Sequence, residues 1–144
     1  MMISDLTVKE DELIGLINEL NKKSNILIEK KKEKISKLKE SQSGILVSEY
    51  VKCGKKSCKC NLESYKHGPY WYYYYWNRGK LRKKYICPIS KPNDTLNELN
   101  KRIENNKNNR IIQKEVKRID KIISRINKIK EKFRNEVIQI FEII

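Results

Sequence analysis

The sequence predicts an α+β fold in which long N-terminal and C-terminal helices flank a three-stranded antiparallel β-meander. Apolar residues recur at helical spacing in both ends of the chain, and β-branched and aromatic residues concentrate in its centre. Glycine and proline separate the central runs, as turn residues separate strands. We therefore divide the 144 residues into an N-terminal helical arm at 1–43, a β module at 44–91 and C-terminal helices at 92–144.

The N-terminal arm carries a leucine at every seventh position from Leu6 to Leu27, which is the spacing of an apolar stripe along one side of a helix. A capping-box sequence that begins at Thr7 predicts that the helix starts near Val8. We expect the helix to end near Glu40, because the Ser-Gln-Ser-Gly sequence that follows favours a turn.

The C-terminal third repeats this pattern more regularly. From Ile112 to Ile144, apolar residues alternate in steps of four and three, and only Lys130 interrupts the stripe. Helices at 8–41 and 110–142 would each be roughly 50 Å long. Equal lengths favour antiparallel pairing as a coiled coil or bundle, either within one chain or through the C-terminal helices of a homodimer.

An earlier apolar stripe, from Leu96 to Ile103, is out of phase with the later one. The residues between the two stripes, Asn105–Asn109, are mostly asparagine and are poor helix formers. We therefore expect a break or a phase shift of the helix at this point.

The central module predicts three strands. The first is Ile45–Val51, the second is the aromatic run Tyr70–Trp76, and the third is Lys80–Ile86, which ends before a proline. An Asn-Arg-Gly sequence between the second and third strands is typical of a hairpin turn. Turns of two and of three residues give opposite registers. The sequence therefore does not determine on which face of the sheet Arg82 and Lys84 lie.

The loop between the first two strands gathers metal-binding side chains. Three thiols and an imidazole, the only histidine of the chain, are a tetrahedral ligand set of structural zinc sites. A loop of about sixteen residues without core residues also needs a cross-link to hold it in one conformation. Thiols stay reduced in the cytoplasm, where such a cluster indicates a metal before a disulfide. Cys87, at the end of the third strand, could replace the histidine as fourth ligand. The predicted zinc ligands are Cys53, Cys58, Cys60 and His67.

The motifs of this segment are Cys-Gly-Lys followed by Cys-x-Cys, then His-Gly-Pro-Tyr before the aromatic strand, and Gly-Lys before a basic strand. They resemble those of a family of small archaeal and bacterial proteins, often encoded beside mobile genetic elements. The resemblance covers Gly44 to Ile89. It implies that the cluster uses His67 and leaves Cys87 outside, and it implies no activity.

Basic residues concentrate in the same module. Residues 50–91 contain eleven Lys or Arg and a single acid, Glu63, whereas residues 1–49 contain nine lysines and nine acids. Ten of the twelve aromatic residues also lie between Tyr50 and Tyr85. Lys and Arg neutralise phosphates and aromatic rings stack on bases, so the pattern predicts a nucleic-acid-binding surface. The candidate contacts are Lys55, Lys56, Lys59, Lys66, Trp71, Tyr73, Arg78, Lys80, Arg82, Lys83 and Lys84.

We interpret the chain as a non-enzymatic nucleic-acid-binding protein, with DNA favoured over RNA and no small-molecule substrate. A catalytic zinc needs an open position and a nearby base, and Glu63 is the only carboxylate of the loop. The alternative is a protein-interaction module, such as an accessory protein or inhibitor that docks on a nucleic-acid machine through its coiled-coil helices. We expect a cytoplasmic protein without a membrane partner, because neither a leader sequence nor a membrane-length apolar run is present.

Overall fold

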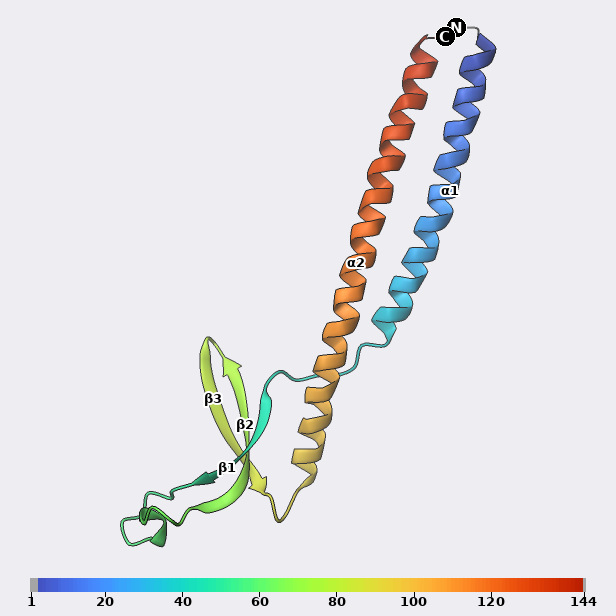
Figure 1. Ribbon diagram of the computed structural model, residues 1–144. Helices are drawn as coiled ribbons and strands as arrows, with labels where there is room; N and C mark the ends of the chain where they lie inside the picture. The colour runs from blue at the N-terminus through green and yellow to red at the C-terminus, as the bar shows by residue number, and fades with distance from the viewer. Residues whose placement is uncertain (1–2, 144) are drawn as a thin grey trace. The chain divides into compact units, whose positions relative to one another are not determined.

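The computed structural model describes the backbone of residues 3–143 and the side chains of residues 7–142. The elements follow in the order α1 (Ile3–Ser36), β1 (Ile45–Val51), the short 3-10 helix η1 (Lys59–Asn61), β2 (His67–Asn77), β3 (Lys80–Pro88) and α2 (Asp94–Ile143) (Figure 1). This order confirms the predicted α+β fold. No helix in the described part of the chain is long and apolar enough to cross a membrane.

The chain forms two compact units. The helical unit consists of Met1–Leu38 and Ile111–Ile144, and the central unit consists of Lys39–Arg110. The long helix α2 therefore contributes its first turns to the central unit and its remainder to the helical unit.

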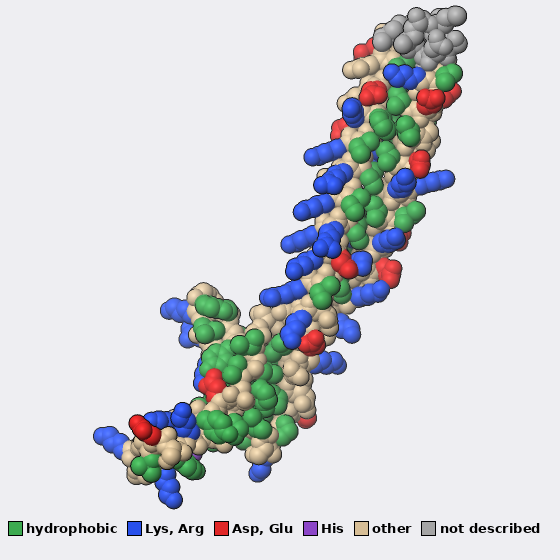
Figure 2. Space-filling model, in the orientation of Figure 1, with side chains coloured by type: hydrophobic (Ala, Val, Ile, Leu, Met, Phe, Trp, Pro, Cys, Tyr) green, Lys and Arg blue, Asp and Glu red, His purple; other side chains and the backbone are tan. Residues whose placement is uncertain are grey.

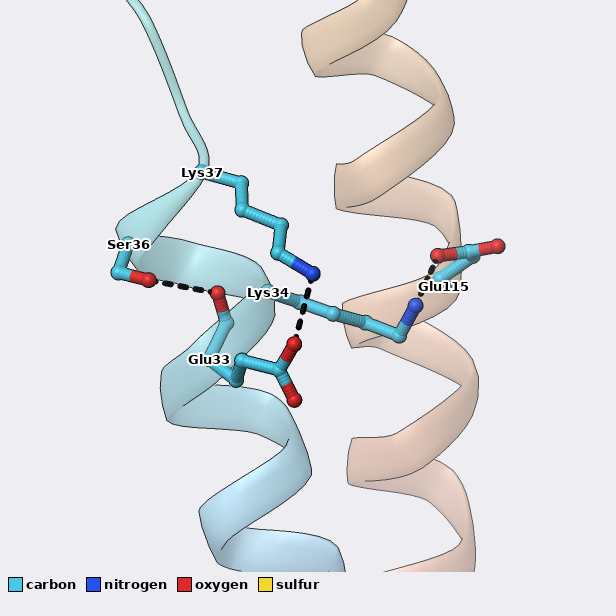
Figure 3. Close-up of polar contacts among 5 residues, drawn as sticks. All are labelled: Glu33, Lys34, Ser36, Lys37 and Glu115. Carbon is cyan, nitrogen blue, oxygen red and sulfur yellow. Dashed lines mark hydrogen bonds and ion pairs between the residues drawn. The ribbon is translucent and has the colours of Figure 1, made fainter.

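In the helical unit, α1 and α2 pack against each other in antiparallel directions, so the predicted pairing forms within one chain (Figure 1). The buried seam contains Leu13 of α1 and Ile119, Ile126 and Ile140 of α2. Ion pairs flank the seam. Figure 3 shows Lys34 reaching from α1 to Glu115 of α2, at 2.5 Å between Nζ and Oε2.

The helix α1 begins before the predicted start at Val8 and ends at Ser36, before the predicted end at Glu40. At its end, the Ser36 hydroxyl donates a hydrogen bond to the carbonyl of Glu33 (Figure 3). Beyond the helix, the backbone forms hydrogen bonds outside α1. The backbone N–H of Lys39 donates to the side chain of Asn109 in α2.

Of the two alternatives predicted at Asn105–Asn109, a break or a phase shift, the break was wrong, because α2 is one continuous helix. The two apolar stripes nevertheless serve different units. Leu99 and Ile103 are buried in the central unit, whereas the later stripe packs against α1. The asparagines use their side chains between these stripes: Asn105 and Asn109 both donate to backbone carbonyls of the linker after α1. The helix thus continues through a run of weak helix formers, because two of their side-chain amides form hydrogen bonds with the linker.

The sheet has the strand order β1-β2-β3 and is antiparallel throughout, as predicted. A two-residue turn at Arg78 and Gly79 joins β2 to β3, with φ angles of 48° and 73°. Positive φ at both positions is typical of a type I′ hairpin turn. The resulting register pairs Tyr75 with Arg82 and Tyr73 with Lys84, which resolves the question of faces that the sequence leaves open.

Tyr73 lies at the centre of the core of the central unit, with 4% of its surface exposed. Its ring packs with Leu99 and Ile103 of α2, and its hydroxyl donates to the carbonyl of Ser43. Gly44 is required beside it, because φ is +125° and a Cβ atom there would lie 2.5 Å from the Tyr73 ring. This packing holds the sheet against the first turns of α2.

Candidate metal centre

The ends of two strands position the cysteine cluster. Cys53 follows the end of β1, and His67 is the first residue of β2, where it pairs with Val51. Cys58 precedes the short helix η1 and Cys60 lies within it. The loop thus returns two of its thiols to the place where the strands begin to separate.

The four predicted ligands converge. Their ligating sulfur and nitrogen atoms all lie within 4.8 Å of one another. Cys53 Sγ is 3.5 Å from Cys60 Sγ, and Cys58 Sγ is 3.1 Å from His67 Nε2. Zinc–sulfur bonds of about 2.3 Å in a tetrahedron place the sulfur atoms about 3.8 Å apart. The cluster therefore fits a metal ion such as zinc with small movements of its side chains.

Cys87 is not part of this cluster. It is buried near the end of β3, where it pairs with Trp71. The structure therefore selects His67 as the fourth member, as the sequence motifs imply.

Backbone contacts shape the loop around the thiols. Gly54 has φ of +76°, which allows the chain to turn directly after Cys53. The Asn61 side chain donates to the carbonyls of Lys55 and Lys56 at 2.9 and 2.8 Å. Asn61 was not among the predicted site residues, and the only signal for it is a polar turn former directly after the Cys-x-Cys motif.

The thiols differ in their electrostatic surroundings. The backbone N–H of Lys55, followed by the Cys60 thiol, lowers the pKa of Cys53 to about 6. The backbone N–H of Cys53 acts to lower the pKa of Cys60, but burial and the neighbouring thiols raise this pKa overall. The lowered pKa of Cys53 favours its thiolate, which is the form that binds metals.

Exposed lysines surround the cluster. Across the described loop, none of them pairs with an acidic side chain, and Glu63 is also exposed and unpaired. Their positive charges would offset the negative charge that the thiols carry once they hold a metal ion. They are Lys55, Lys56, Lys59 and Lys66.

The hairpin divides its cations between two faces. Side chains at alternate positions of β3 share a face, so Lys80, Arg82 and Lys84 lie on the Tyr75 side, all of them exposed. Lys83 lies on the other face, where it forms an ion pair with Glu49 of β1 and lies 4.0 Å from the centre of the Tyr72 ring. Lys83 is the one hairpin cation in the described chain that has an acidic partner.

The aromatic residues are distributed differently from the prediction. Tyr73, predicted to stack on a base, is a core residue, and Trp71 is half-buried. Trp76, at the end of β2, is instead 71% exposed. Sequence reasoning missed Trp76 because alternation alone does not say which face of an aromatic strand the core covers.

Comparison with known proteins concerns the same segment. No curated protein and no solved structure matches the chain. A family model described as a domain of unknown function (DUF6788) matches residues 25–93, just under half of the chain. The match includes the whole sheet and all four members of the cluster. Over these residues the chain is similar to the DUF6788 domain.

Proposed function

We propose that the central unit binds nucleic acid, with DNA favoured, and that the Cys53, Cys58, Cys60 and His67 cluster holds a structural zinc ion. The protein would act by binding and not by catalysis. Four protein ligands fill a tetrahedral site, which leaves no position for a substrate.

The zinc ion would act as a cross-link. It would join the end of β1 to the start of β2 and so fix the loop between these strands, which carries five lysines. The loop between these strands contains one buried residue, Cys60, and so has almost no core of its own.

The observation that carries the nucleic-acid proposal is a row of cations without acidic partners. Within the described central unit, Lys80, Arg82 and Lys84 form no ion pair, although Glu49 lies on the same sheet and pairs with Lys83. Unpaired cations crowded on one strand repel one another, and a polyanion relieves this repulsion. Phosphates bound by such a row would release counterions, which drives binding to nucleic acid.

A second candidate function rests on the helical unit. Apolar side chains remain exposed on both helices, among them Ile26 of α1 and Ile122 and Ile129 of α2. Figure 2 shows a stripe of hydrophobic side chains along this unit. Such a stripe favours a protein partner that docks on the helices, so a protein-interaction module is the alternative to nucleic-acid binding.

The metal is tested by elemental analysis of protein purified under reducing conditions. We expect one zinc per chain, and its removal by chelator should unfold the central sheet. Cys58→Ser should lose the metal, whereas Cys87→Ser, which changes a buried thiol outside the cluster, should keep it. Folded protein without metal would contradict the proposal.

Nucleic-acid binding is tested by the salt dependence of affinity for a DNA duplex. If four to six unpaired cations reach phosphates, log affinity should fall with log salt with a slope of about −4 to −5. The double variant Arg82→Glu and Lys84→Glu should flatten the slope by about 2 and weaken binding to all sequences alike. The matched control reverses Lys121 and Lys128, two exposed cations of the helical unit without ion pairs. The alternative function would be favoured if the control variant lost more DNA affinity than the Arg82 and Lys84 variant. It would also be favoured if the wild-type protein did not bind DNA.

A further inference from the structure

A second feature of the central unit is a cleft beside the hairpin end, with a volume of about 390 Å³. This volume lies within the range of roughly 300–1,000 Å³ that small-molecule sites occupy. Tyr74, Trp76 and Leu81 of the hairpin line one side, and Asn106, Lys107 and Arg110 of α2 line the other. All these residues belong to the central unit.

The apolar side of the cleft is unusually exposed. Trp76 is 71% exposed and Leu81, its partner in the β2–β3 register, is 55% exposed. An indole is the largest apolar surface that a side chain offers, and exposure of this kind commonly marks a binding surface. The Trp76 side chain is thus open to solvent where it lines the cleft.

The opposite side of the cleft is basic and polar. No acidic side chain lines the cleft. Lys107 pairs with Glu104 one turn earlier in α2, at 3.1 Å in an exposed position where such a pair contributes little. Arg110 forms no ion pair with any residue that the structure describes. An anion that enters the cleft would therefore meet two available cations.

We propose that this cleft receives one unpaired base of a single-stranded nucleic acid. The base stacks on Trp76, its edge faces the Asn106 amide, and Lys107 and Arg110 neutralise the adjacent phosphates. The proposal rests on the proposed function and narrows it from nucleic acid in general to strands with unpaired bases. A base within a duplex is stacked on both faces and does not reach such a site.

The test uses Trp76 as its own reporter. The chain has two tryptophans, so the variant Trp71→Phe leaves Trp76 as the only indole. Three probes of equal length are titrated: a single-stranded oligothymidylate, an abasic strand with the same phosphates, and a duplex. We expect the first to quench Trp76 fluorescence strongly and the other two to quench it little, because only the first offers a free base.

Affinity measurements complete the test. Trp76→Ala should weaken binding of the single strand about 5- to 150-fold, the range of one base–aromatic stack, and change duplex affinity less than about twofold. Trp76→Phe, which keeps a ring, should retain most of the affinity and shows whether loss of the fold explains the alanine variant. Tyr50→Ala is the matched control, since Tyr50 is 61% exposed and lies outside the cleft.

The outcomes separate this inference from the proposed function. If the abasic strand quenches as strongly as the oligothymidylate, or if Trp76→Ala has no effect, the cleft binds no base, although binding through Arg82 and Lys84 still stands. If Trp76→Ala weakens single strand and duplex equally, the preference for unpaired bases is wrong. If no probe binds, both the inference and the proposed function are wrong.

Discussion

Asn109 offers a sharp test of how the linker after α1 is held. Its side chain, in a residue that is 7% exposed, donates to the Lys39 carbonyl at 2.6 Å and accepts from the Lys39 N–H at 3.1 Å. Each such hydrogen bond contributes about 1 kcal/mol net to stability. We therefore expect Asn109→Ala to lose about 2 kcal/mol of the free energy of unfolding, less the few tenths that alanine adds to a helix.

The matched control is Asn108→Ala, an exposed asparagine one position earlier in the same helix, with the same change of helix propensity. The difference between the two variants isolates the two bonds to Lys39. Urea unfolding followed by tryptophan fluorescence reports on the central unit, which contains both indoles. With a slope of roughly 2 kcal/mol per molar urea, the midpoints should differ by about 1 M. Equal midpoints would show that these bonds do not stabilise the unit.

Three further predictions concern other contacts. Lys130 Nζ donates to Asn21 Oδ1 at 3.1 Å across the helical seam, so Lys130→Ile alone should change the melting temperature little. The double variant Lys130→Ile and Asn21→Leu should raise the free energy of unfolding by about 1–2 kcal/mol. If its effect equals the sum of the effects of the two single variants, the two residues are not coupled. Gly44→Ala should destabilise by several kcal/mol, because a Cβ there would lie 2.5 Å from backbone and core ring atoms; a shift under about 0.5 kcal/mol would refute the close packing. A hydrogen bond from Lys83, and to a smaller extent one from the Tyr74 hydroxyl, lowers the pKa of Glu49. Ionised Glu49 therefore stabilises the folded chain at pH values above the pKa that Glu49 has in the unfolded chain. This stabilisation is lost as the pH falls through the lower pKa that Glu49 has in the folded chain. The difference in melting temperature between wild type and Glu49→Gln should accordingly be larger at pH 7 than at pH 3.

The sequence was sufficient for features that depend on local pattern. Seven-residue spacing predicted both long helices, because helical periodicity places such residues on one side whatever surrounds them. The strands and the hairpin turn followed from β-branched and aromatic runs around an Asn-Arg-Gly sequence. The cluster of Cys53, Cys58, Cys60 and His67 followed from residue type and spacing, since few other side chains share that chemistry.

Tertiary structure decided the features that depend on which partner a residue meets. The two-residue turn set the register, and the register buried Tyr73 while it left Trp76 in solvent. The same register brought Lys83 to Glu49 and left Lys84 without an acid. Asn109 belongs to a run that predicted a break, yet its amide holds the backbone of a residue seventy positions away. Side-chain exposure and pairing arise from contacts distant in sequence, which local periodicity does not encode.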